Sequence, residues 1–167
     1  MNKYRKIAFL IMLVIIANVA VTKTSALNKE NRYIYEGSTI CNGFVINKYK
    51  KMDYTSVMTT TKFKGFEYRV SRDGVLCFIF NQEVNFVYGI PTSNGDYAQI
   101  TNYSAKVTYT NSSSAYYPDT SELTNSLVKF GNPAKLTSKI PIRKKSNNKK
   151  VDTPSLISKF YGSGRTE

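Results

Sequence analysis

The sequence has no histidine, no tryptophan and only two cysteines in 167 residues. Without histidine, the chain cannot form a Ser-His-Asp triad, a Cys-His pair or a histidine-ligated metal site. Two cysteines are too few for a four-cysteine zinc site or for the ligands of an iron–sulfur cluster. The sequence also lacks a glycine-rich phosphate loop, an EF-hand loop and a zinc-finger pattern. We therefore predict a protein without catalytic residues, without a bound metal and without a cofactor.

The first 26 residues have the three parts of a secretory signal peptide. Three of residues 3–6 are basic, residues 7–21 are almost all apolar, and small residues precede a cleavage point after Ala26. An apolar helix of this length spans about 22 Å, which is shorter than a membrane hydrocarbon core of about 30 Å. We therefore predict an exported protein that is cleaved after Ala26, and an uncleaved membrane anchor is the alternative.

Both cysteines, Cys41 and Cys77, follow the predicted cleavage point. Outside the cytosol, a lone pair of cysteines usually forms a disulfide. A bridge between them would close a loop of about 37 residues, which the chain-entropy model values at roughly 3–4 kcal/mol. We predict this disulfide, and two buried free thiols are the alternative. A redox or catalytic role is not expected, because there is no CxxC pattern and no histidine that could activate a thiolate.

Positive charge is concentrated near the C-terminus. Residues 27–126 carry 10 basic and 9 acidic side chains, whereas residues 127–167 carry 10 basic and only 2 acidic ones. The stretch with the most basic residues, 143–150, has no apolar residue. It predicts a solvated, largely flexible basic tail over residues 132–167. Such a tail either binds an anionic surface or only increases solubility. The candidate binding residues are Arg143, Lys144, Lys145, Lys149 and Lys150.

Residues 27–131 are predicted to form an antiparallel β domain. They are rich in Tyr, Thr, Val, Ile and Phe, which favour strands, and in Gly, Asn and Asp, which favour turns. Residues 75–80 are apolar on both faces, which is typical of a central strand. Asp73-Gly74 predicts a tight turn before that strand, and the polar residues 81–83 predict a turn after it. This short spacing favours a mainly β fold, either an antiparallel β-sandwich or a small barrel.

Two short helices are also predicted. Residues 120–130 have Asp119 as a helix N-cap, apolar residues at helical spacing and Gly131 just after the end. Near the C-terminus, Pro154 fits the first position of a second helix that ends before Gly162. Its apolar residues share one face, so we expect it either to dock on the β domain or to form on a membrane surface.

Together these features predict a small, secreted, non-catalytic protein of bacterial origin, since its 15 Asn and 18 Lys fit an AT-rich genome. The expected partner is an anionic cell-envelope polymer, a membrane surface, or a host or competitor protein; nucleic acid is not expected. One alternative is a membrane-active toxin or bacteriocin-like factor that uses the basic tail and the terminal helix. Another is a histidine-independent hydrolase. Its candidate carboxylates are Asp53, Glu67, Asp73 and Glu83.

Overall fold

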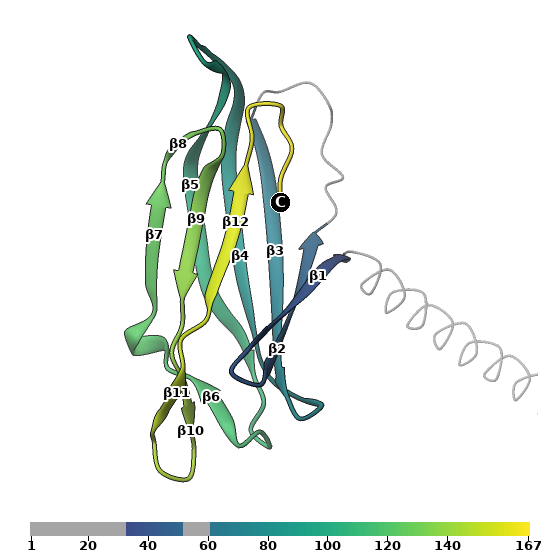
Figure 1. Cartoon of the computed structure of the whole chain (residues 1–167), viewed down its shortest axis with the longest axis vertical. Coiled ribbons are helices and arrows are strands. Elements are labelled where there is room, and N and C mark those ends of the chain that lie inside the picture. Colours follow the sequence, from purple (N-terminus) through teal and green to yellow (C-terminus); the bar gives the residue numbers. More distant parts are fainter. Residues whose placement is uncertain (1–32, 52–60) are drawn as a thin grey trace, which may run out of the picture. The chain divides into compact units, whose positions relative to one another are not determined.

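The computed structural model describes residues 33–51 and 61–167, and most of them are in strands (Figure 1). Ile34–Glu167 forms one compact unit. The predicted mainly β, antiparallel fold class is confirmed, in the form of a curled sheet that makes a half-barrel. The predicted signal peptide and its cleavage point lie outside the described residues.

The largest element is a six-stranded sheet with the strand order β1-β2-β3-β4-β5-β8. Its strands are β1 (Tyr33–Cys41), β2 (Phe44–Lys51), β3 (Thr61–Arg72), β4 (Val75–Thr92), β5 (Gly95–Thr110) and β8 (Phe130–Gly131). The predicted turn joins β3 to β4, where Asp73 and Gly74 have φ angles of 51° and 77°, a region that Gly and Asp tolerate better than other residues. The apolar stretch 75–80 starts β4, which lies between β3 and β5 as predicted for a central strand.

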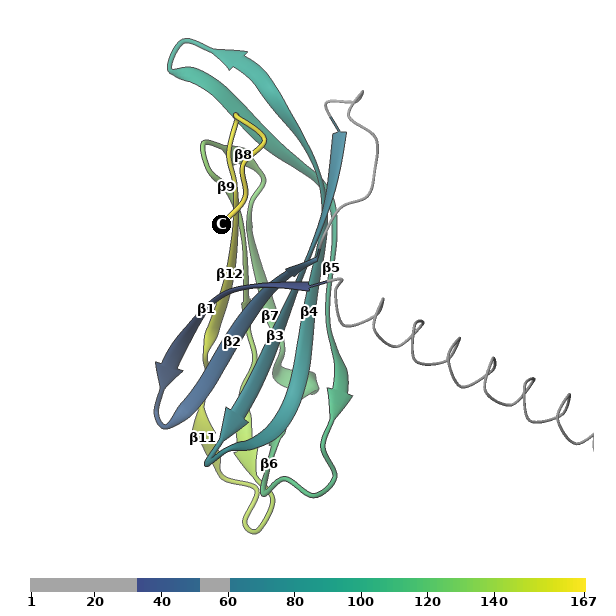
Figure 2. The ribbon, with the colours of Figure 1, turned by 90° about the vertical axis from the view of Figure 1, so that its right-hand side faces the viewer.

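The remaining strands form two small sheets. One has the order β12-β9-β7 and the other the order β11-β10-β6. Their strands are β6 (Tyr116–Pro118), β7 (Thr124–Val128), β9 (Ala134–Lys139), β10 (Ile142–Lys144), β11 (Lys150–Asp152) and β12 (Ser155–Phe160). Figures 1 and 2 show β7, β9 and β12 as a second layer that faces the concave side of the large sheet.

The curl of the large sheet follows from irregular pairing of its two longest strands. The β4–β5 ladder shifts register between Ile79 and Phe80, between Asn85 and Phe86, and between Val87 and Ile90. Each such bulge bends the strand and increases its twist. Gly89 lies in the last bulge with a φ of 70°, and its N–H donates to the Gly162 carbonyl at 2.9 Å. The bulges therefore curve the large sheet around the small sheet formed by β12, β9 and β7 (Figure 2).

The core lies between the two layers and is built largely from phenylalanine. Phe160 of β12 has its ring centroid 4.9 Å from that of Phe86 and 6.1 Å from that of Phe66. Other core residues come from both layers. Those with 0% exposure include Phe44, Val70, Phe78, Phe80, Val84, Leu136, Ile140 and Ile142.

A buried polar network joins the two layers through Gln82, which is fully buried in β4. Its Nε2 donates to Ser138 Oγ at 2.8 Å, and its Oε1 accepts from Ser158 Oγ at 2.6 Å and from Tyr68 Oη at 3.1 Å. Tyr68 Oη also donates to the Ile157 carbonyl at 3.0 Å. The turn predicted at residues 81–83 is therefore wrong, because these residues lie within the continuous strand β4. The facing layer satisfies the hydrogen bonds of the buried Gln82, and Asn81 Oδ1 accepts from Thr108 Oγ1 of the neighbouring strand β5.

The helix predicted over residues 120–130 is also wrong. Asp119 does cap a helical turn, and its Oδ1 accepts from Ser121 N at 3.2 Å, but the turn is a single 3-10 turn, η1 (Thr120–Glu122). The chain then becomes β7, which pairs with β9 with Leu127 opposite Leu136. Thr, Asn, Ser and Val have weak helix propensity, so pairing with an existing strand overrides the helical spacing.

Residues 132–167, predicted as a flexible basic appendage with a terminal helix, instead form β9, β10, β11 and β12. Leu156 is 2% exposed and Phe160 is fully buried, and both belong to the main core. In β12 the even-numbered residues are buried and Ser155 and Ile157 are exposed, which is the period of a strand. The boundary predicted at residue 131 is therefore corrected, since the segment after it completes the second layer.

The predicted disulfide is absent, and Cys41 and Cys77 are free and not close together. Cys41 ends β1 and Cys77 is in β4, so two strands separate them in the sheet. Three steps of about 4.8 Å between neighbouring strands give roughly 14 Å, whereas a disulfide needs Cα atoms within about 7 Å. The order of the strands therefore excludes the bridge.

Candidate binding surfaces

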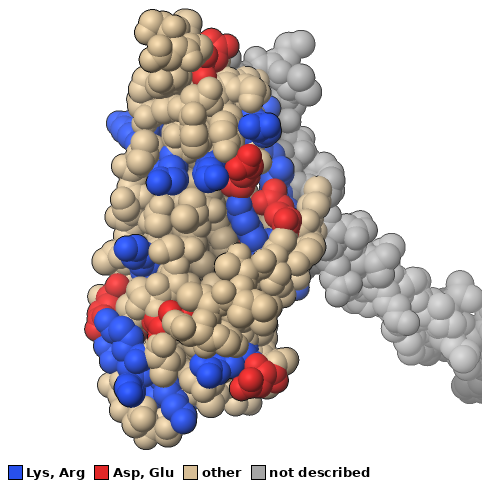
Figure 3. Space-filling model, in the orientation of Figure 1, with Lys and Arg blue, Asp and Glu red and all other residues tan. Residues whose placement is uncertain are grey.

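The five predicted basic residues lie together on one hairpin, residues 142–152, which we call the basic hairpin. Arg143 and Lys144 are in β10, Lys150 begins β11, and Lys145 and Lys149 are in the connection between the strands. Figure 3 shows the resulting group of blue side chains at the end of the molecule where Figure 1 places β10 and β11. The structure thus brings these residues together on a β scaffold.

Two carboxylates hold the base of the basic hairpin. Arg143 Nε lies 2.6 Å from Asp119 Oδ2, and Arg143 Nη2 lies 2.6 Å from Glu122 Oε1. Lys150 Nζ lies 2.5 Å from the other oxygen of Glu122. Hydrogen bonds from Ser121 and Arg143 lower the pKa of Asp119, and hydrogen bonds from Lys150 and Arg143 lower the pKa of Glu122. The charges of Arg143 and Lys150 are therefore largely compensated within the protein.

The other three basic residues keep their positive charge uncompensated. Among the described residues, no ion pair joins Lys144, Lys145 or Lys149 to a carboxylate. Lys145 Nζ donates to the Ser112 carbonyl at 2.6 Å, which fixes its position without neutralising it. The turn is closed by backbone hydrogen bonds from Lys144 N to Lys149 O at 2.9 Å and from Asn148 N to Lys144 O at 2.8 Å. This end of the molecule therefore presents three positive charges to solvent on a hydrogen-bonded turn, and the ammonium group of Lys145 is held in place.

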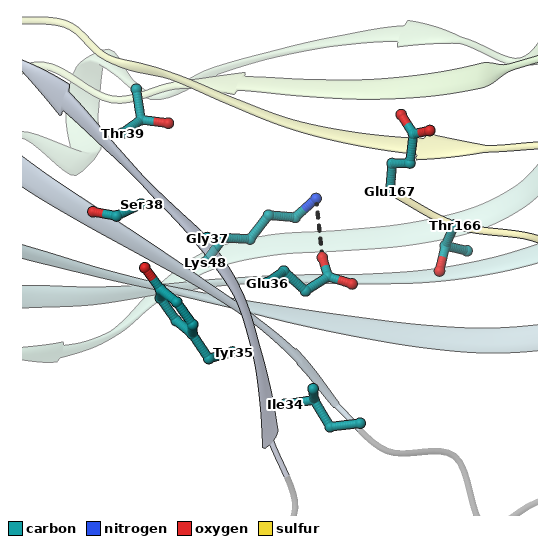
Figure 4. A pocket seen from close by; sticks show the side chains of 9 residues that line it. All are labelled: Ile34, Tyr35, Glu36, Gly37, Ser38, Thr39, Lys48, Thr166 and Glu167. Atoms are coloured by element: carbon teal, nitrogen blue, oxygen red, sulfur yellow. Dashed lines mark ion pairs between the residues drawn. The ribbon is translucent and has the colours of Figure 1, made fainter.

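A second surface feature is a groove between the edge strands β1 and β12, which we call the β1–β12 groove. It consists of two hollows of about 560 and 340 Å³ that share Thr39 and Lys48. Figure 4 shows the larger one, where Glu36 and Lys48 point toward each other between β1 and the C-terminal residues Thr166 and Glu167. The smaller hollow is lined by Thr39, Cys41, Ile46, Lys48, Tyr68, Pro154, Ser155, Leu156 and Ile157.

An ion pair lies inside the groove. Lys48 Nζ is 3.4 Å from Glu36 Oε2, and their side chains are only 20% and 19% exposed. Lys48 Nζ also lies 4.6 Å from the centroid of the Phe66 ring. Burial lowers the pKa of Lys48, and the charge of Glu36 and its hydrogen bond oppose that shift. The groove therefore has a charged centre at the junction of its two hollows.

Asp152 lies beside Cys41 in the same region. The side chain of Asp152 accepts from Asn42 Nδ2 at 2.9 Å and from Thr153 N at 2.8 Å through Oδ1. Hydrogen bonding to Asp152, burial and the negative charge of Asp152 together raise the pKa of the Cys41 thiol. Because the thiolate is the nucleophilic form, the raised pKa makes Cys41 a poorly activated thiol.

The candidate carboxylates of the hydrolase alternative are not all together: Glu67 and Glu83 are diagonal neighbours on one face of the β3–β4 pair, since Glu67 is opposite Asn81 and Gly65 is opposite Glu83, but Asp73 lies apart from them. Glu67 pairs with Arg69 at 2.6 Å, Asp73 is in the β3–β4 turn, and Glu83 is in β4. Asp53 lies outside the described residues. In the described part of the chain, no three His, Cys, Asp or Glu side chains are grouped so that they could hold a metal ion. No helix within that part is long and apolar enough to cross a bilayer.

Comparison with known proteins gives no match: no family model, no curated protein and no solved structure resembles this chain at a significant level. The two surfaces described above are therefore the observations from which a function can be argued.

The residues of the basic hairpin can be recognised in the sequence, but the β1–β12 groove cannot. The groove is formed by strands from opposite ends of the described chain, so no local spacing indicates it. One signal was present: Ile34, Tyr35 and Ile40 place large apolar residues on both faces of a single strand. That pattern indicates either a strand covered on both sides or an edge strand with exposed apolar residues.

Proposed function

We propose that the protein is an exported, non-catalytic binding protein that attaches to an anionic polymer through the basic hairpin. The main support is that Lys144, Lys145 and Lys149 have no compensating carboxylate among the described residues, whereas Arg143 and Lys150 use Asp119 and Glu122 to hold the hairpin in shape. A fixed arrangement of charges loses less conformational entropy on binding than a flexible tail would. The ligand is a polymer that bears phosphate or sulfate groups.

The membrane-active alternative requires a terminal helix in addition to the basic residues. It relied on a terminal amphipathic helix, but the same residues form β12, whose apolar side chains Leu156 and Phe160 are buried in the core. A surface that attracts anions through lysines alone fits a hydrated polymer better than the interior of a bilayer.

The proposal is tested by measuring binding of the purified protein to immobilised heparin, a sulfated polymer, and to lipoteichoic acid, a phosphate polymer. The double variant K144Q/K149Q removes two charges that make no ion pair among the described residues. At about 1 kcal/mol per lysine near an anionic surface, we expect roughly 30-fold weaker binding to at least one polymer. High salt should abolish the binding of the unaltered protein, because it screens exposed charges.

A matched control variant, K106Q/K129Q, changes the net charge by the same amount at exposed lysines of β5 and of the β7–β8 connection. We expect it to weaken binding less than threefold. Equal losses in the two double variants would show that only net charge matters, and the role of the hairpin would then be wrong.

A further inference from the structure

The outer edge of β12 is already used in part by the C-terminal residues. Lys159 N donates to Glu167 O and Glu167 N donates to Lys159 O, both at 3.0 Å. Because successive residues of a strand direct their backbone groups to alternate sides, Ser155 and Ile157 direct N–H and C=O to the same side as Lys159. The Ile157 carbonyl accepts from Tyr68 Oη at 3.0 Å, so the groups left open on this side are the N–H and C=O of Ser155 and the N–H of Ile157. β12 is the last strand of its sheet, so within the described residues no strand covers this edge at Ser155 and Ile157.

Across the groove, β1 is the last strand of the large sheet and has an unusual surface. Ile34, Tyr35 and Ile40 are 49%, 55% and 74% exposed, and Ile157 on the β12 side is 39% exposed. An edge strand with exposed apolar side chains is a template for pairing with another chain. Proteins that have no partner for such an edge usually protect it with charged residues or proline.

The floor of the smaller hollow is apolar. Ile46, Leu156 and Tyr68 are at most 6% exposed as residues, yet they line a space of about 340 Å³. The groove thus combines an unpaired strand edge with a recess below it. That combination is how a sheet recognises an extended peptide: the edge binds the main chain, and recesses take alternate side chains.

We propose that the β1–β12 groove binds an extended peptide segment of another protein, which pairs with Ser155 and Ile157 of β12 and places an apolar side chain on Ile46 and Leu156. The segment would continue the ladder that residues 165–167 begin on the same edge. The occupant is an extended segment because the adjoining residues already form an antiparallel bridge between Thr166 and Phe160 on this edge, and because the open groups, the N–H and C=O of Ser155 and the N–H of Ile157, belong to the backbone. A folded second copy carries its edge strands as part of a sheet, and its binding would appear in the test as self-association.

The test uses a displayed library of random ten-residue peptides selected on the purified protein, followed by fluorescence binding of the enriched peptides. The variant I157P removes an outward N–H, and proline is tolerated at strand edges on the solvent side. Its matched control is L127P in β7, the opposite edge of the same small sheet, where the side chain is 37% exposed and the N–H also points outward. We expect peptides with alternating apolar residues, at least tenfold weaker binding to I157P and unchanged binding to L127P.

Should I157P fail to fold, amide exchange in the unaltered protein decides the question, because a bound strand must slow exchange of the Ser155 and Ile157 amides. Three results would overturn the proposal: no peptide enriched above background, peptides that bind I157P as tightly as the unaltered protein, or self-association through β1 at the concentrations used. The basic hairpin takes no part in this experiment, so its outcome is independent of the polymer-binding proposal.

Discussion

The two sides on which the large sheet meets the second layer differ in how they are closed. On the β5 side, β8 pairs with β5 through Ala98–Gly131 and Gln99–Phe130, and Ile100 N donates to Lys129 O at 2.8 Å. On the β1 side, no strand in the described ranges joins β1 to β12, and the β1–β12 groove remains. The closed side is made from consecutive strands, β7, β8 and β9, whereas β1 and β12 come from opposite ends of the described chain. Short connections therefore close one side, and the β1–β12 groove remains on the other.

The largest expected effect tests whether β12 belongs to the core. Phe160→Ala removes a fully buried ring that contacts Phe66 and Phe86. We expect the free energy of unfolding to fall by about 3–5 kcal/mol, as is usual for a buried phenylalanine. Urea unfolding followed by circular dichroism measures this loss. In the same strand, Ile157→Ala is the control and should cost less than about 1 kcal/mol. A small effect of Phe160→Ala would contradict the role of β12 in the core and would favour residues 132–167 as a flexible appendage.

A smaller effect tests the polar network that joins the layers. Gln82→Ala removes a donor to Ser138 and an acceptor from Ser158 in a site closed to water. We expect a loss of about 2 kcal/mol, because buried partners are left without hydrogen bonds. The half-buried Gln99 of β5 provides the same substitution as a control. If both variants lost equal stability in thermal unfolding, the network would not hold the layers together.

The smallest effect concerns the thiols and the open side of the molecule. Only Cys41, which lines the groove, should react with a thiol reagent in the folded protein, since Cys77 is fully buried. Asp152 raises the pKa of Cys41 by hydrogen bonding and by its charge. Asp152→Asn should therefore lower that pKa and shift the pH profile of the reaction rate to lower pH. An unshifted profile would contradict the contact, and finding two linked sulfurs by mass spectrometry would contradict the strand order.

Much of the fold could be predicted from residue patterns because β periodicity is local. The apolar stretch 75–80, the Asp73-Gly74 turn and the mainly β class all depend on neighbouring residues, and the structure confirms them. The predicted helices failed for a physical reason. Around Leu127 and Leu156 the apolar spacing fits both a helix and a strand, and pairing with β9 decides for the strand.

For the candidate surfaces too, some features could be predicted from the sequence and others could not. A dense run of lysines is visible in a linear sequence, so the residues of the basic hairpin could be named before the fold was known. Their mutual arrangement could not, because it depends on Asp119 and Glu122, more than twenty residues away. The pairing assumed for Cys41 and Cys77 failed because composition carries no information on strand order.

The sequence alone determined that this chain forms antiparallel strands, that it lacks histidine chemistry, and that its positive charge is concentrated near the C-terminus. These properties are set by residue type and by neighbours along the chain. Tertiary structure alone decided that the basic segment completes the core, that the thiols stay apart, and that a groove is left between β1 and β12. Those outcomes depend on which strands meet, and that is set by pairing and burial between residues far apart in the chain.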